Sequence, residues 1–388
     1  MNDAGTAAPV AGWTDPRFAG VRDAFADNFA RHGEVGASVC VAVGDRIVVD
    51  LWGGHADAAR TSPFGPDTLV DVFSVGKGLV ALLTARLVGD GLLDVDDRVA
   101  GRWPEFAWAG KQDVTLRHLL AHQAGLPAIR RRLPPGAMLD WEVMVGVLAA
   151  ETPWWEPGTR HGYHVNTFGF LVGEVLGRVT GRTVGQLLRE LVAGPLGADV
   201  HLGLPDAEHH RVADFLWPAD PPPEVEPEGL DEDDLMRHNA YFNPSGISGA
   251  GVVNTPAWRR AEIPSTNTHA SARGIARVYT ALAAGGATDG VRVVDAHALA
   301  AATHEEVAGH DCVLQRPTRF GLGFQLTQPE RPLGPSPSAY GHFGAGGSLG
   351  FCDPEARVAF GYAMNRLGTR WRNPRNRALI DAVYACLG

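Results

Sequence analysis

The stretch of sequence that decides the fold covers residues 69–89 and reads LVDVFSVGKGLVALLTARLVG. Its first five residues are mostly apolar and favour an extended segment. The residues after Ser74 carry the apolar spacing of a helix that stops near Gly91. Ser74 is therefore expected at the start of a helix. Lys77 follows at i+3, so the two side chains share one helical face.

This Ser-x-x-Lys pattern is suited to nucleophilic chemistry. A desolvated Lys77 can share the proton of the Ser74 hydroxyl and help to generate an alkoxide. The free N–H groups and the positive dipole end of a helix N-terminus stabilise negative charge that develops beside them. Lysine occurs only at positions 77 and 111 of the 388 residues, so a chance match is uncommon. The spacing alone leaves open a plain alternative, a helix-capping serine beside a surface lysine.

Sheet is predicted near both ends of the chain. Residues 37–53 form two apolar, β-branched runs around Gly44-Asp45, a pattern typical of a hairpin. Residues 319–365 alternate like antiparallel strands, and a helical pattern closes the chain. From about residue 94 to residue 200, apolar residues recur at three- and four-residue intervals, which indicates helices.

These patterns predict an α/β fold made of two interleaved units. Residues 1–90 and 268–388 are expected to form one α/β domain, an antiparallel sheet flanked by helices, around an inserted, mainly helical domain at 91–267. The insert holds an acidic stretch, residues 203–234, with eleven acidic residues and one arginine. We interpret residues 203–240 as a solvated, lid-like surface loop.

Composition excludes several classes of protein. With 34 Lys and Arg against 44 Asp and Glu, the net charge is −10, which argues against a nucleic-acid partner. No apolar run is long enough to predict a membrane span, and the N-terminus lacks a secretory pattern, so we expect a cytoplasmic location. The four cysteines lie far apart, which favours neither a metal site nor a disulfide framework. The sequence does not determine the oligomeric state.

Two other motifs are weaker candidates for a site. Residues 346–350, GGSLG, fit the G-x-S-x-G elbow of a different hydrolase fold. No histidine follows His342, however, and Ser348 precedes strand-like residues rather than a helix, so a glycine-rich turn is favoured. His118 and His122 are four residues apart on one face of a predicted helix, but no third metal ligand is identifiable, so structural roles are favoured.

Three motifs together carry a family resemblance. They are the Ser-x-x-Lys at 74–77, the run WEPGT at 155–159 that leads to Tyr163, and GHFGAGG at 341–347. Residues 117–127, RHLLAHQAGLP, resemble a further recurring segment. In these features, over roughly residues 15–387, the chain resembles the serine β-lactamase and DD-peptidase superfamily, most closely its esterase branch, the family VIII carboxylesterases. The resemblance implies a β-lactamase-like fold.

The resemblance also implies catalytic roles. Ser74 matches the acylated nucleophile, and Lys77 matches its proton partner. Tyr163 matches a tyrosine that, as a phenolate or through a proton shared with Lys77, acts as general base and later protonates the leaving group. That role requires a tyrosine pKa below about 10, which a neighbouring lysine cation would provide. The backbone N–H groups of Ser74 and Ala345 match the oxyanion hole.

Substrate contacts are implied in the same way. His342, Phe343 and Gly344 match the strand triad that is Lys-Thr-Gly in β-lactamases, and close backbone approach explains the glycine. His342 either contacts the substrate or packs internally. Trp155 and Tyr241 are candidate walls of an acyl pocket, because aromatic residues often line such pockets, although ordinary packing is the alternative.

Two departures from the β-lactamase pattern bear on the substrate. Tyr163-His164-Val165 stands where β-lactamases have Tyr-x-Asn, so an amide that holds the substrate and the lysine is missing. The strand triad begins with His342 instead of lysine, which weakens recognition of a carboxylate. With the expected cytoplasmic location, both departures favour neutral acyl esters over β-lactams and cell-wall peptides.

We therefore expect a serine hydrolase that cleaves carboxylic esters of small molecules through an acyl-enzyme on Ser74, without a cofactor or a metal. An acyltransferase with the same intermediate is the first alternative. β-Lactamase or D-peptidase activity is the second, and a binding module that has lost turnover is the third. The physiological ester and its acyl chain length are not set by the sequence.

Overall fold

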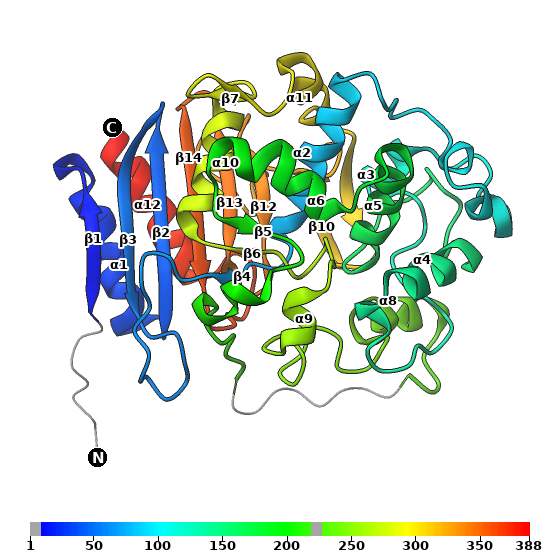
Figure 1. The fold of residues 1–388 in the computed structure, drawn as a ribbon, viewed down its shortest axis with the longest axis horizontal. Coiled ribbons are helices and arrows are strands. Elements are labelled where there is room, and N and C mark those ends of the chain that lie inside the picture. The colour runs from blue at the N-terminus through cyan, green and yellow to red at the C-terminus, as the bar shows by residue number, and fades with distance from the viewer. Residues whose placement is uncertain (1–8, 219–226) are drawn as a thin grey trace.

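A nine-stranded antiparallel sheet dominates the computed structural model, which describes residues 9–218 and 227–388 (Figure 1). Its strand order is β1-β3-β2-β14-β13-β12-β11-β10-β9. The strands are β1 (Val10–Thr14), β2 (Gly36–Val43), β3 (Arg46–Gly54), β9 (Val307–Asp311), β10 (Arg316–Phe320), β11 (Gln325–Leu326), β12 (Tyr340–Phe343), β13 (Leu349–Asp353) and β14 (Val358–Met364). The antiparallel pairing of β2 with β14, with Val39 opposite Tyr362, joins the two ends of the chain in one sheet.

Helices cover both faces of this sheet (Figure 1). Helices α1 (Ala19–Arg31) and α12 (Pro374–Leu387) pack together on one face. On the other face, α10 (Ala272–Ala283) packs against β2, β13 and β14, and α2 (Val75–Gly89) packs against β12. The expected α/β fold, an antiparallel sheet flanked by helices, is thus confirmed, as is the hairpin at 37–53.

The middle of the chain is mainly helical, as expected. Its α-helices are α3 (Leu116–Leu120), α4 (Trp141–Ala150), α5 (Thr167–Thr180), α6 (Val184–Leu188), α7 (Gly194–Leu196), α8 (Glu232–Phe242) and α9 (Pro256–Arg260), and α11 (Ala296–Ala302) follows α10. Short strands are β4 (Val70–Asp71), β5 (Val200–His201), β6 (His269–Ala270), β7 (Ala287–Thr288) and β8 (Val291–Arg292). The division into domains at 1–90 with 268–388 and at 91–267 stays a prediction.

Single-turn elements complete the chain. The 3₁₀ turns are Pro16–Phe18, Val99–Gly101, Pro104–Gly110, Ala137–Leu139, Asp206–Arg211 and Ala345–Gly347, and Arg189–Ala193 is a π-helical turn between α6 and α7. No helix in the described part of the chain has the length and apolar character needed to cross a bilayer.

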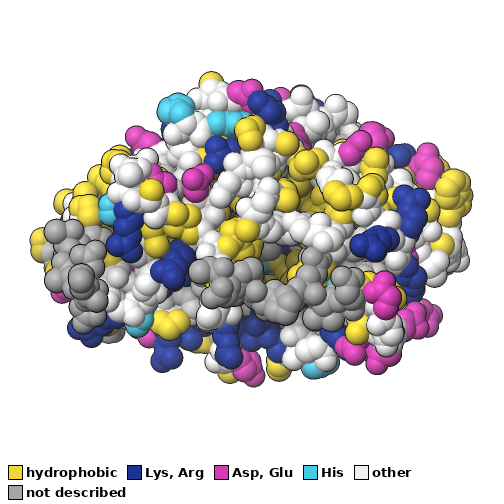
Figure 2. Space-filling model, turned by 90° about the horizontal axis from the view of Figure 1, so that it is seen from below, with side chains coloured by type: hydrophobic (Ala, Val, Ile, Leu, Met, Phe, Trp, Pro, Cys, Tyr) yellow, Lys and Arg dark blue, Asp and Glu magenta, His cyan; other side chains and the backbone are white. Residues whose placement is uncertain are grey.

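The acidic stretch is not one continuous loop, which corrects the interpretation of residues 203–240. Residues 206–211 form a 3₁₀ turn, and α8 begins directly after Asp231, whose carboxylate accepts from the N–H of Asp234. Acidic residues in the first turn of a helix are stabilised by the helix dipole, and α8 buries Met236 and Ala240. Residues 219–226 of the stretch lie outside the described residues. Acidic and basic side chains are interspersed with apolar ones on the face shown in Figure 2.

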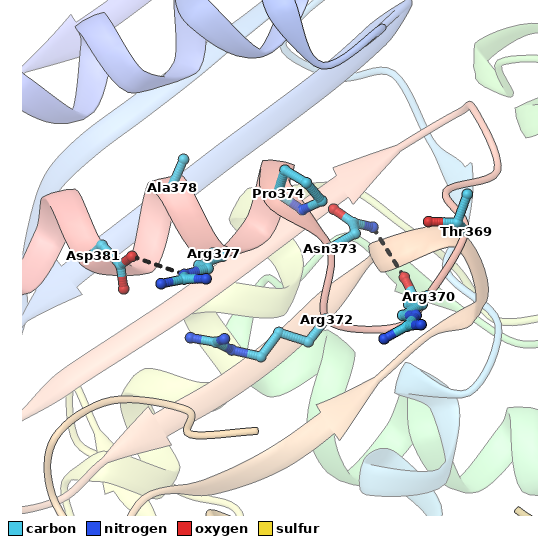
Figure 3. Close-up of a pocket in the computed structure, with 8 residues that line it drawn as sticks. All are labelled: Thr369, Arg370, Arg372, Asn373, Pro374, Arg377, Ala378 and Asp381. Carbon is cyan, nitrogen blue, oxygen red and sulfur yellow. Dashed lines mark hydrogen bonds and ion pairs between the residues drawn. The ribbon is translucent and has the colours of Figure 1, made fainter. Parts of the chain in front are cut away.

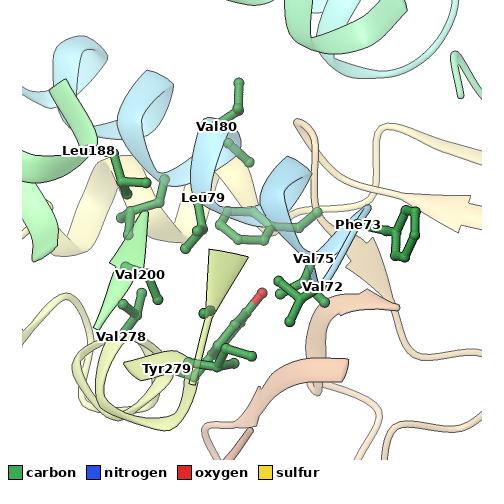
Figure 4. Packing of buried hydrophobic residues seen from close by; sticks show 14 of the residues in the cluster. Val72, Phe73, Val75, Leu79, Val80, Leu188, Val200, Val278 and Tyr279 are labelled. Carbon is green, nitrogen blue, oxygen red and sulfur yellow. The ribbon is translucent and has the colours of Figure 1, made fainter. Parts of the chain in front are cut away.

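The first turn of α2 lies inside the hydrophobic core. Figure 4 shows residues that lead into and follow Ser74 packed against side chains from α6, β5 and α10: Val72, Phe73, Val75, Leu79, Val80, Leu188, Val200, Val278 and Tyr279. Gly76 fits here because a Cβ at this position would lie 2.3 Å from Thr268 Oγ1 and 2.8 Å from the carbonyl oxygen of Pro264. The segment 264–268 therefore presses against the turn that holds Ser74 and Lys77.

Candidate active site

Ser74 and Lys77 lie at the buried N-terminal end of α2, the helix start that the sequence predicts. Ser74 is the N-cap residue and is 6% exposed, whereas Lys77 is completely buried. Lys77 Nζ lies 3.1 Å from Ser74 Oγ. It also donates to the backbone carbonyl oxygens of Val165, at 2.7 Å, and Ser265, at 3.0 Å. The alternative of a surface lysine is therefore wrong.

The surroundings of Lys77 favour its neutral form. Burial holds the pKa of Lys77 well below its usual range, and no carboxylate in the described part of the chain pairs with it. A neutral amine has two hydrogens and one lone pair. Because the carbonyls of Val165 and Ser265 accept both hydrogens, the lone pair faces the Ser74 hydroxyl. The geometry is that of a base ready to accept the serine proton.

The turn before Ser74 has an unusual backbone. Phe73 adopts a φ of 49°, a left-handed conformation that is uncommon for a bulky residue. The buried Asp71 carboxyl holds this turn, because it accepts from the Phe73 N–H at 2.9 Å and from the Trp258 indole N–H at 2.8 Å. Burial raises the pKa of Asp71 to about 8. The nucleophile is thus presented from a sharp strand-to-helix turn.

Tyr163 is fully buried beside Ser74 and Lys77. The centroid of its ring lies 4.7 Å from Lys77 Nζ, and Ser74 lies near enough to its hydroxyl to oppose part of the rise in its pKa. Its backbone N–H donates to both carboxylate oxygens of Asp311, at 3.1 Å each. The structure thus brings together the three side chains that the sequence singled out, and their catalytic roles stay a prediction.

The protonation of Tyr163 differs from the expectation. Burial raises the pKa of Tyr163 well above its usual range, where a lowered pKa was expected. The expected lowering required a lysine cation, but burial lowers the pKa of Lys77 as well. Burial therefore favours a neutral amine and a neutral phenol as the resting pair, and a neutral phenol is a proton donor.

His342 contacts Tyr163 from the end of β12. The buried ring has its pKa lowered to about 3 by burial, so it is neutral at pH 7. Its Nδ1 lies 2.7 Å from the Phe343 carbonyl oxygen and donates to it. Nε2 is then an acceptor, and it lies 3.5 Å from the Tyr163 hydroxyl. Of the two roles left open, internal packing against Tyr163 is the one the contacts describe.

The two predicted oxyanion-hole N–H groups are free. Neither the Ser74 N–H nor the Ala345 N–H has a hydrogen-bond acceptor among residues 9–218 and 227–388. Gly344 lets their two segments meet, because a Cβ there would lie 2.2 Å from the carbonyl oxygen of Val72. Phe343, which is 4% exposed, anchors this end of β12 by donating its N–H to Gln325 Oε1 at 2.9 Å.

Trp155 and Tyr241 sit at different depths. Trp155 is 7% exposed and packs against Met236 and Ala240 in a small apolar cluster under α8. Tyr241 lies on α8 itself and is 38% exposed. A charge on Tyr241 would raise the pKa of Tyr163 further, and the ring contact of Tyr241 is with Phe242 on the same helix. Trp155 therefore supports the helix that carries Tyr241.

Two aromatic neighbours of Tyr163 were missed. The Trp371 ring centroid lies 5.1 Å from that of Tyr163, and the His122 ring centroid lies 5.0 Å away. His122 was expected on a helix face shared with His118, but α3 ends at Leu120 and His122 has a φ of 60°. Its Nδ1 accepts from the His164 N–H at 3.2 Å, so it shapes the segment around Tyr163. Trp371 lies 208 residues after Tyr163 and belongs to no recognisable motif, so the sequence did not indicate this contact.

The residues beside Trp371 line a separate cavity of about 490 Å³ (Figure 3). Three arginines, Arg370, Arg372 and Arg377, contribute to its wall, and Arg377 pairs with Asp381 at 3.4 Å. Ser74 is not among its lining residues.

The other motifs take structural places. Ser348 is buried in the turn between β12 and β13, its carbonyl accepts from the Gly344 N–H at 2.7 Å, and a strand follows it. Its surroundings are not those of a nucleophile elbow, which requires a following helix. Among the described residues no cluster of three or more His, Cys, Asp or Glu side chains could hold a metal ion, and the cysteines are free thiols.

Comparisons with known proteins agree with this arrangement. The family model described as "Beta-lactamase" matches residues 21–385. The chain is 36% identical to "Esterase/beta-lactamase LipL" of Mycobacterium tuberculosis over 92% of its own length and 83% of that protein. It is 44% identical to a solved family VIII carboxylesterase, with a TM-score of 0.90 over 97% of this chain and 100% of that one. A penicillin-binding protein homologue from Caulobacter crescentus is 43% identical, with a TM-score of 0.90 over the same shares.

Proposed function

The chain belongs to the β-lactamase family, and from that premise we propose that it is a serine hydrolase that cleaves carboxylic esters of small molecules through an acyl-enzyme on Ser74. The observation that carries the proposal is the environment of Lys77, whose amine has two backbone carbonyls and the Ser74 hydroxyl as its hydrogen-bond partners. The names of the relatives, a carboxylesterase and an esterase/β-lactamase, support esters as the substrate class.

Acylation begins at the Ser74–Lys77 pair. Ser74 Oγ attacks the ester carbonyl carbon while its proton passes to Lys77 Nζ, 3.1 Å away. The carbonyl oxygen becomes an oxyanion, and the unpaired N–H groups of Ser74 and Ala345 donate to it. When the bond to the alcohol oxygen breaks, that oxygen takes the proton of the Tyr163 hydroxyl, and Lys77 returns its proton to the phenolate. The products of this half-reaction are the free alcohol and the acyl-enzyme.

Deacylation reverses these proton transfers with water in place of the alcohol. Tyr163 passes its proton to Lys77 and takes the proton of the water that attacks the acyl carbon, and Lys77 returns its extra proton to Ser74 Oγ as the bond to the acyl group breaks. The released product is the carboxylic acid. His342 Nε2 accepts from the Tyr163 hydroxyl and so keeps the phenol oriented beside Ser74.

Backbone carbonyl oxygens hold Lys77 here, a role that an asparagine side chain has in β-lactamases. Here Val165 carries no amide, but its carbonyl oxygen accepts from Lys77. Asn166, one position later, points away and donates to the carbonyl oxygen of Ala240 at 2.8 Å. The lysine is therefore held while the substrate-binding amide is absent, so we expect β-lactams to be poorer substrates than esters. A chromogenic cephalosporin, compared with an ester under the same conditions, tests this expectation.

A paired assay tests the proposed function. Wild type and Ser74→Ala are compared on short p-nitrophenyl esters, and a phosphonate probe is followed by intact mass. We expect turnover and a single covalent adduct in the wild type and loss of both in Ser74→Ala. A Ser74→Ala variant that keeps both would contradict the proposal and make Ser348 the residue to test. Adding an alcohol or amine acceptor distinguishes hydrolysis from acyl transfer through the product formed.

A further inference from the structure

Arg316 lies close to the site and plays no part in the steps above. It begins β10, directly opposite Asp311 of β9, the residue whose carboxylate holds the backbone of Tyr163. Its guanidinium carbon lies 4.5 Å from the centroid of a Trp371 ring, and that residue's ring packs 5.1 Å from the ring of Tyr163. One aromatic side chain therefore separates this guanidinium from Tyr163.

Arg316 has no counterion within the described residues. Its side chain is partly buried, and its Nε is buried without a hydrogen-bond acceptor. The nearby Asp311 carboxylate is already used, because it accepts from the N–H groups of Tyr163, Val313 and Leu314 and from the Thr318 hydroxyl. Leaving a partly buried guanidinium without a partner costs free energy, and a bound anion would remove that cost by pairing with it.

The other charged groups around Arg316 add to the positive potential. The charge of Arg370 lowers the pKa of Arg316, and the charge of Arg316 in turn lowers the pKa of Arg331. Arg331 is occupied, because its guanidinium donates to the carbonyl oxygen of Pro317. Tyr163 and Tyr241, the remaining titratable neighbours, are phenols whose pKa values are raised by burial and which are neutral at pH 7. An anion that enters beside Trp371 thus meets the unpaired guanidinium of Arg316, with those of Arg370 and Arg372, which also lack an ion pair among the described residues, close by.

We propose that Arg316 binds a carboxylate of the substrate, so that the preferred substrates are esters with a free carboxylate, such as half-esters of dicarboxylic acids. A guanidinium presents two parallel N–H donors that match a carboxylate, and that of Arg316 lies over the Trp371 ring without an ion-pair partner among the described residues. The inference rests on ester hydrolysis at Ser74. It replaces the expectation of neutral esters, which followed from the missing lysine at position 342, because Arg316 supplies a cation from a different strand.

The test compares monoethyl glutarate with its primary-amide analogue, ethyl 4-carbamoylbutanoate, which has the same shape and no charge. Ethanol release is measured for wild type, Arg316→Gln and Arg46→Gln. Arg46 is a control for net charge, because it lies on β3, near the opposite edge of the sheet, and pairs with Asp15 at 2.9 Å. Arg316→Gln is expected to lower kcat/KM for the half-ester by about tenfold or more, mainly through KM, and to change the amide analogue by less than about twofold. Arg46→Gln is expected to change neither.

A second readout uses binding alone. Glutarate is expected to inhibit hydrolysis of p-nitrophenyl acetate competitively in the wild type and to lose most of that inhibition in Arg316→Gln. The proposal is overturned if Arg316→Gln affects both ethyl esters equally or neither, or if glutarate inhibits both proteins alike. Absence of p-nitrophenyl acetate turnover and of a Ser74 adduct would instead refute the ester hydrolase itself.

Discussion

The two lysines of this chain are both shielded from solvent, but burial lowers the pKa of Lys77 more strongly than that of Lys111. Lys77 and Lys111 are both fully buried, and each has three oxygen atoms around Nζ. Around Lys111 all three are backbone carbonyl oxygens, those of Trp108, Ala149 and Glu151. Around Lys77 one of the three is the Ser74 hydroxyl. A hydroxyl group beside Lys77, in place of a third carbonyl oxygen, therefore distinguishes its hydrogen-bond partners from those of Lys111.

The helices near the two lysines reinforce this difference. Lys77 lies in the first turn of α2, where the positive end of the helix dipole disfavours a cation. Lys111 binds carbonyls at the end of α4, where the negative end favours one, and the charge of Glu151 acts in the same direction. Burial lowers the pKa of Lys111 to about 8, so it stays charged at pH 7 and uses three N–H donors. Burial therefore acts more strongly on Lys77, whereas the charge of Glu151 offsets part of its effect on Lys111.

The largest expected difference is catalytic. Lys77→Met removes the base, and we expect kcat for p-nitrophenyl acetate to fall by about 10³-fold or more, comparable to Ser74→Ala. Lys111→Met, the matched change at the other lysine, is expected to keep kcat within about threefold where the protein is folded. Retained activity in Lys77→Met, or a folded Lys111→Met protein without activity, would contradict the assignment of roles.

Two glycines, Gly76 near Lys77 and Gly146 in α4, allow the effect of backbone packing at the two lysine sites to be compared. Gly76→Ala places a Cβ against Thr268 and Pro264, next to Ser265, whose carbonyl holds Lys77. We expect kcat to fall by about 10–100-fold, because the catalytic geometry shifts by a fraction of an ångström. Gly146→Ala in α4 has open space around it, so activity is expected to be unchanged. Steady-state kinetics on both variants decides this, and equal effects would count against it.

The pH dependence follows from the form of Lys77 that is active. Only the neutral amine accepts the Ser74 proton, and the lowered pKa of Lys77 means that it loses its own proton at a lower pH than a free lysine. Activity is thus expected on a plateau at neutral and mildly alkaline pH and to decline as the pH falls through the lowered pKa. Lys111→Met should leave the profile unchanged. A rate that rises only near pH 10 would show an ordinary lysine.

Lys111→Met, the lysine variant with the smaller expected effect on catalysis, is expected to lose stability. Lys111→Met leaves three buried carbonyls without donors, and we expect the free energy of unfolding to fall by about 2–4 kcal/mol. Lys77→Met leaves two carbonyls unpaired and removes a neutral amine, so its loss should be smaller. Urea unfolding of both variants measures the difference. The reverse order would indicate that Lys77 is the charged residue.

Much of the fold was predictable because its strongest signals are local. The hairpin β2–β3 and helix α2 are encoded by uninterrupted apolar runs with clear turn residues between them. Strand β1 and helix α1 were missed. β1 is mostly exposed, and its pairing with β3 depends on residues about 40 positions away. Only three residues of α1 are buried, so its sequence carries a weak apolar pattern.

The site shows the same division. Ser74, Lys77 and Tyr163 carry a motif order that the sequence displays. Trp371 reaches Tyr163, and Arg316 reaches Trp371, through the tertiary fold alone. The pKa of Tyr163 is shifted upward, opposite to the expectation, because burial acts on Tyr163 itself and also lowers the pKa of Lys77, which spacing does not report. Backbone carbonyls, such as that of Val165, leave no trace in the residue types.

The most direct test of the central claim observes the two lysines themselves. Since the chain has lysine only at positions 77 and 111, protein labelled with ¹³Cε-lysine gives two lysine signals, which Lys77→Met and Lys111→Met assign. The account predicts that at pH 7 the Lys77 signal has the shift of a neutral amine and that the Lys111 signal titrates from ammonium to amine near pH 8. A Lys77 signal at the ammonium position at pH 7, changing only near the usual lysine pKa of about 10.4, would contradict it.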